Sequence, residues 1–129
     1  MSYVETLGGV DIEFGRKMWQ SLRDKEDFRM QGIFWLLDSE AGEWHLVIAT
    51  PKVDSVGPRD AYRELAAITR DIPAEPRQLL KITLISPKQP MYEALRSVFG
   101  ETASVEGARL GNTLVGGRSI DEAYLYEIR

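Results

Sequence analysis

Two apolar segments joined by a short acidic link constrain the fold of this chain more than any other feature of its sequence. Residues 29–37 and 44–50 are rich in aromatic and branched side chains, and the link "DSEAGE" covers residues 38–43. Two such runs with a glycine-containing link predict an antiparallel hairpin. Residues 33–37 and 46–49 are apolar on both faces of the strands they would form. Because strands of this kind are normally covered on both sides, we expect this hairpin at the centre of a sheet.

Helical periodicity predicts three helices that can cover such a sheet. The first begins at Asp11, a good N-cap residue, and places apolar residues at every fourth position from 14 to 22 before it ends near residues 25–27. The second has Pro58 in its first turn, and Pro73 and Pro76 end it. A third, shorter helix lies within residues 87–100 and ends at Gly100.

Three further strands are expected. The segment "LLKITLIS" (79–86) alternates with period two, a second strand covers Ala108 to Val115 with a break at Gly111, and the last covers Ala123 to Ile128. The segment "SIDE" (119–122) also fits a capping box that opens a terminal helix, although the alternation in "AYLYEI" favours a strand. The predicted order is α-β-β-α-β-α-β-β. It indicates a single α+β domain over residues 1–129, with a mixed, mostly antiparallel sheet and about three packed helices.

The composition excludes several kinds of site. The chain has 129 residues, a formal net charge of −4 and no cysteine. Disulfides and cysteine-ligated metal centres are therefore excluded, and the composition fits a reducing compartment. The negative charge argues against nucleic-acid binding, which depends on phosphate contacts. The first residues lack a secretory pattern and the longest apolar run, "GIFWLL", is far too short for a membrane span, so we expect a cytoplasmic protein.

The loop before the second helix is a candidate ligand site. It carries Lys52 and Asp54, and Arg59 lies in the first turn of the helix. A helix N-terminus that follows a strand favours anions, so these residues predict binding of a carboxylate or a phosphate. However, Pro58 removes one N–H donor, and Asp60 would repel an anion. These features favour the alternative interpretation, a tight connection with a proline-started helix and no ligand.

The hairpin tip is a candidate metal site. Glu43 and His45 are two positions apart, which places both side chains on one face of a strand. With the nearby carboxylates of Asp38 and Glu40 they could bind a divalent metal. The alternative is a solvated acidic turn, with His45 as an ordinary strand residue that binds no metal.

Aromatic side chains form a candidate protein interface. Trp35, Trp44 and Tyr124 lie on predicted strands, and an exposed patch around them would mark a partner surface. The pattern favours packing in the core over such a patch, with Trp35 and Trp44 as cross-strand neighbours. The two hairpins also leave strand edges that could pair with another chain.

The stretch "EWHLVIATPKVDSVGPRDAYREL" (43–65) resembles a segment shared by a group of small bacterial proteins. These proteins carry W-x-L-V-I-A-T/S-P-x-V-D-x-x-G-P-x-x-A-Y after an F/L-W-L strand, and the similarity covers residues 33 to about 65. It implies a bacterial cytoplasmic origin. No activity is established for the group, so the resemblance implies no catalytic residue.

The sequence carries no catalytic signature. It has a single histidine, and no serine lies in a G-x-S-x-G elbow. We therefore expect a small bacterial interaction or accessory module that binds another protein or itself and uses no cofactor. The alternative is a small-molecule- or metal-dependent enzyme with its site at the hairpin tip or in the loop 51–60.

Overall fold

The computed structural model describes residues 5–100, 105–115 and 117–129 of the chain. Its elements are α1 (Gly9–Arg23), β1 (Gly32–Asp38), β2 (Glu43–Ala49), α2 (Lys52–Ser55), α3 (Pro58–Thr69), α4 (Pro76–Leu80), β3 (Ile82–Ile85), α5 (Pro90–Phe99), β4 (Arg109–Val115) and β5 (Arg118–Ile128). The α+β class and the predicted order are confirmed. Within the described residues there are five helices rather than about three, because α2 and α4 are additional short helices.

One five-stranded sheet, in the order β3-β2-β1-β5-β4, organises the chain. β1 pairs antiparallel with β2 and β5, β4 pairs antiparallel with β5, and β2 pairs with β3 in parallel. The sheet is therefore mixed and mostly antiparallel, with β1 at its centre, as predicted. Because β1 opposes both neighbours, β2, β3 and β5 run in the same direction and end at the same edge of the sheet.

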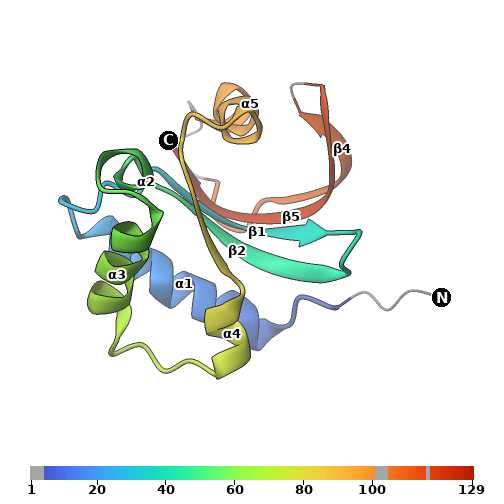
Figure 1. Cartoon of the computed structure of the whole chain (residues 1–129). Helices are drawn as coiled ribbons and strands as arrows, with labels where there is room; N and C mark the ends of the chain where they lie inside the picture. Colours follow the sequence, from blue (N-terminus) through green and yellow to red (C-terminus); the bar gives the residue numbers. More distant parts are fainter. Residues whose placement is uncertain (1–4, 101–104, 116) are drawn as a thin grey trace.

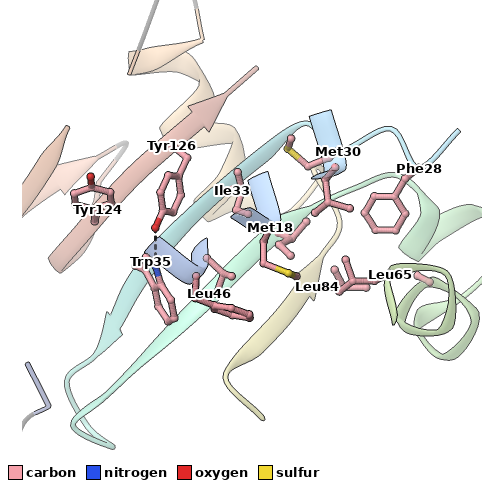
Figure 2. Close-up of a cluster of buried hydrophobic side chains, with 14 of the residues drawn as sticks. Met18, Phe28, Met30, Ile33, Trp35, Leu46, Leu65, Leu84, Tyr124 and Tyr126 are labelled. Atoms are coloured by element: carbon pink, nitrogen blue, oxygen red, sulfur yellow. Dashed lines mark hydrogen bonds between the residues drawn. The ribbon is translucent and has the colours of Figure 1, made fainter. Parts of the chain in front are cut away.

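The sheet separates two apolar cores (Figure 1). Helices α1, α3 and α4 cover one face, where Trp35, Leu46 and Tyr126 pack with Met18 and other side chains (Figure 2). Helix α5 covers the opposite face, together with the curled β4–β5 hairpin. The double coverage explains why β1 and β2 are apolar on both faces.

Helix α4 corrects the prediction of a strand over residues 79–86. Pro76 is the first helical residue and Glu75 is its N-cap. The side chains of Glu75 and Gln78 form a capping box, each bonded to the backbone of the other. Leu79 and Leu80 therefore belong to a helix, and β3 begins at Ile82. Pro76, which was expected only to end the preceding helix, therefore starts a new one.

The beginning of α1 also differs from the prediction. Gly8 is the N-cap, and Asp11 lies in the first turn of the helix, where it is buried. The Asp11 carboxylate accepts hydrogen bonds from Arg77 at 3.2 Å and from Gln78 at 3.3 Å. Asp11 therefore joins α1 to α4 instead of capping α1.

The last strand is longer than predicted, while β4 nearly matches its predicted bounds. β5 begins at Arg118, so "SIDE" is part of a strand and opens no helix. β4 continues through Gly111, and the irregularity falls on Asn112, which has a left-handed backbone with φ of 43°. Asparagine tolerates this conformation better than most residues do.

Candidate functional site

The predicted ligand corner at residues 51–60 is held by its own side-chain contacts. Lys52 lies in α2 and forms an ion pair of 3.4 Å with Glu64 of α3. The carboxylate of Asp54 accepts a hydrogen bond of 2.6 Å from the Ser86 hydroxyl after β3. Arg59 is exposed in the first turn of α3. Two of the three residues thus tie α2 to neighbouring elements, which is what the interpretation as a tight connection requires. Ligand binding at this corner stays a prediction.

The backbone of the corner explains its shape. Gly57 is the N-cap of α3 with φ of 87°, a left-handed conformation that suits glycine, and Pro58 is the first helical residue. The hydroxyl of Thr50 donates to the Phe28 carbonyl and accepts the Lys52 N–H, which fixes the chain between β2 and α2.

The hairpin tip places Glu43 and His45 on one face of β2, as predicted. The imidazole Nε2 and the Glu43 carboxylate lie 3.8 Å apart. Asp38 instead serves the turn, because its carboxylate accepts the N–H groups of Glu40 and Ala41 at 3.1 and 3.2 Å. Across residues 5–100, 105–115 and 117–129, no group of three or more histidine or carboxylate side chains is arranged for a metal ion. The prediction of a metal site therefore rests on a pair of side chains.

The three aromatic residues predicted at an interface lie in the interior. Trp35 is fully buried, and Trp44 and Tyr124 are 6% and 7% exposed. Trp35 is opposite Leu46 and Trp44 is opposite Leu37, so the two tryptophans are diagonal neighbours on one face of the sheet. The prediction of an exposed aromatic patch at these positions is wrong, because all three side chains pack in the core.

A buried polar chain lies among these aromatic side chains. The Trp35 indole donates a hydrogen bond of 3.0 Å to the Tyr126 hydroxyl (Figure 2). This hydroxyl donates in turn to the Ile12 carbonyl at 2.6 Å. Burial raises the pKa of the Tyr126 phenol far above its ordinary value. On the other face, burial raises the pKa of Tyr92 to about 12. These tyrosines are held neutral and serve the core.

The sheet edges are obstructed. On the outer side of β3, the Leu84 N–H donates to the Tyr62 hydroxyl at 2.9 Å, so this donor is unavailable to another strand. On β4, the left-handed Asn112 interrupts the ladder, and the Gly111 carbonyl accepts the Thr113 hydroxyl at 2.8 Å. Both features are typical of edges protected against pairing. The expected strand-edge interface is therefore disfavoured at both ends of the sheet.

An apolar surface was missed by the sequence analysis. Val10 at the start of α1 is 65% exposed, and Leu79 and Leu80 in α4 are 55% and 84% exposed. We call these three residues the α1–α4 surface. Beside it lies a groove of about 350 Å³, lined in part by Val10, Phe14 and Gln78. The sequence signal for this surface was the capping box that starts α4. Because residues 79 and 80 belong to this helix and not to a strand, both leucines are exposed.

Asp11 and Gln78 hold the α1–α4 surface together. They are the immediate neighbours of Val10 and Leu79, and they are hydrogen-bonded to each other. Both are buried, and Arg77 adds an ion pair to Asp11. Hydrogen bonding to Glu75 and the charge of Asp11 raise the pKa of Arg77. These buried polar contacts therefore fix α1 and α4, which bear the exposed aliphatic side chains, relative to each other.

In the part of the chain that the structure describes, no helix is long and apolar enough to cross a membrane. Comparisons of the chain with protein-family models, with curated proteins and with solved structures found no match.

Proposed function

We propose that this chain is an interaction module that associates with a second copy of itself through the α1–α4 surface. The observation that carries this proposal is the exposure of Val10, Leu79 and Leu80 on two adjoining helices. Exposed aliphatic groups gathered on one surface are typical of association sites. The resemblance to bacterial proteins and the cysteine-free composition support the bacterial cytoplasm as its setting.

The groove beside this surface makes it self-complementary. Glu13 and Lys17 also line the groove, and they lie four residues apart on α1. In a two-fold dimer, each residue of one copy meets a different residue of the other. Leu79 and Leu80 of one copy would then enter the groove of the second, with Glu13 of one copy facing Lys17 of the other.

The size of this surface indicates a modest affinity. A stable interface covers roughly 800 Å² on each partner, while three aliphatic side chains form only its centre. We therefore expect a dissociation constant on the order of micromolar, a range typical of small reversible interfaces.

Sedimentation velocity over a wide concentration range tests the proposal. The wild type should form a dimer as the concentration rises, and Leu80→Asp should remain monomeric because it places a charge at the centre of the interface. Leu114→Asp is the matched control, since Leu114 is 73% exposed on β4, away from the α1–α4 surface. It should dimerise as the wild type does.

Two outcomes would refute self-association through this surface. One is a wild type that stays monomeric throughout the concentration range. The other is a dimer that survives Leu80→Asp. If Leu114→Asp instead abolishes the dimer, the interface lies on β4 and not on the α1–α4 surface. Far-UV circular dichroism of both variants shows whether the fold is retained.

A further inference from the structure

We infer that a cavity at the C-terminal end of α1 is a binding site for a small organic anion with phosphate or carboxylate groups. The cavity has a volume of about 500 Å³, within the range of small-molecule sites, roughly 300–1,000 Å³. It lies at the opposite end of α1 from Val10, about 20 Å away for a helix of this length. The inference is therefore independent of association through the α1–α4 surface.

The charges around the cavity favour an anion. Four of the chain's 16 lysine and arginine residues line it, against one acidic side chain, that of Glu26; the four are Arg23, Lys25, Arg29 and Arg129. On a chain with a net charge of −4, this cluster is a local reversal of sign. Such a concentration of one charge in a concave site attracts ligands of the opposite charge.

Two of these cations are available to a ligand. Arg23 lies 4.0 Å from Asp24, and Arg129 is paired with Glu127. By contrast, Lys25 and Arg29 form no ion pair with any residue that the structure describes. A guanidinium group binds carboxylate or phosphate oxygens in a bidentate manner, and an ammonium adds a further charge.

The backbone at Arg29 is a second, independent observation. Arg29 has φ of 59°, the left-handed region that non-glycine residues seldom occupy. Its surroundings hold it there: Met30 is buried, the Gln31 N–H donates to the Ala49 carbonyl, and the Arg129 N–H donates to the Gln31 carbonyl. Glycine would avoid the strain, yet the position carries the longest cationic side chain. Strain of this kind is concentrated at functional sites.

The location of the cavity agrees with its proposed use. β2 and β5 both end at this edge of the sheet, and Pro51 and Arg129, which follow these strands, line the cavity. Loops that a rigid sheet holds in place commonly carry binding residues. Leu22 and Met30 lie beneath the cavity and are almost fully buried, while the half-buried Pro51 offers an apolar side chain to the carbon skeleton of an organic anion.

Isothermal titration of the full chain with inorganic pyrophosphate and, separately, with citrate tests the inference and distinguishes phosphate from carboxylate recognition. The key variant is Arg29→Gly, which removes the cation and relieves the left-handed strain. Binding should weaken by about 10- to 100-fold, the effect of one charge-assisted hydrogen bond. The melting temperature should stay equal to that of the wild type or rise, so loss of binding cannot result from unfolding.

Arg63→Ala is the matched control, because Arg63 is exposed on α3 and does not line the cavity. It should bind both probes as the wild type does, and Arg29→Lys should retain part of the affinity. Amide chemical shifts should move for residues 22–31 and for Arg129, which also lines the cavity. The inference is overturned if neither probe binds, if Arg29→Gly and Arg63→Ala weaken binding equally, or if the shifts spread over the whole surface.

Discussion

Replacing Tyr126 by phenylalanine tests how much the buried polar chain contributes to stability. The hydroxyl of Tyr126 accepts the Trp35 indole N–H and donates to the Ile12 carbonyl. Trp35 is fully buried and Tyr126 is 1% exposed, so water cannot replace the lost group (Figure 2). Loss of the hydrogen bond from the indole costs about 1 kcal/mol, the stranded indole N–H adds roughly 1–3 kcal/mol, and loss of the bond to Ile12 adds little. Because the Ile12 carbonyl lies within α1 and keeps a helical partner, we expect a total of about 2–4 kcal/mol.

Urea unfolding, followed by tryptophan fluorescence and circular dichroism, measures this loss. With a slope of about 1–3 kcal/mol per molar urea, the midpoint should fall by roughly 1–2 M. Tyr62→Phe is the matched control, since it also removes a hydroxyl with one backbone partner, at a site that is 40% exposed. Water can satisfy the Leu84 N–H there, so the loss should stay below about 1 kcal/mol.

A double-mutant cycle separates the hydrogen bond from packing. Trp35→Phe combined with Tyr126→Phe removes donor and acceptor together, so the double variant should be more stable than the sum of the two single losses predicts, by about 1 kcal/mol. The reasoning fails if Tyr126→Phe costs less than about 0.5 kcal/mol or no more than Tyr62→Phe does, because either result means that the indole N–H is satisfied without the hydroxyl.

Three further predictions concern stability. Burial raises the pKa of Tyr92 to about 12 and also raises that of Tyr126. The fold therefore favours the neutral phenols, and the free energy of unfolding measured in urea should fall as the pH rises above about 10, by up to about 1.4 kcal/mol per pH unit for each tyrosine. Gly15→Ala should destabilise by about 1–3 kcal/mol in thermal denaturation, because its Cβ would overlap the Tyr126 hydroxyl; Gly9→Ala, with open space around it, should be neutral or stabilising. Asp11→Ala should cost about 1–3 kcal/mol in urea unfolding, since it leaves the buried Gln78 amide without its partner; a loss no larger than that of Glu13→Ala on the exposed side of α1 would contradict this.

The elements that the sequence predicted well are those whose signals are local. The start of α3 at Pro58 and the end of α5 before Gly100 follow from backbone preferences of single residues. The central position of β1 and β2 follows from side chains that are apolar on both faces. Helix α4 was missed because Pro73 and Pro76 were taken only as the end of α3, although Pro76 at a first helical position with Gln78 at the third is a start signal.

The candidate sites depend on contacts between distant segments and were harder to predict. The cationic cavity joins residues 23–29 to Arg129, about a hundred positions away, through the pairing of β1 with β5. No local pattern in the sequence specifies that pairing. The burial of Asp11 has the same origin, because its partners in α4 belong to an element that was not predicted. When the partners of a residue are distant in the sequence, the residues next to it in the chain do not indicate its contacts.

The state of the sheet edges decides which kind of association this fold supports. A chain that worked by strand addition would keep the N–H and C=O groups of its outer strands free over several residues. Here β3 is four residues long and its Leu84 N–H is bonded to Tyr62, while β4 contains the left-handed Asn112. The exposed aliphatic side chains, by contrast, stand on helices whose relative position is fixed by buried polar contacts. Association through packed helices therefore requires no change in the sheet, whereas strand addition would first have to break the Tyr62 contact at one edge or rebuild the backbone at the other.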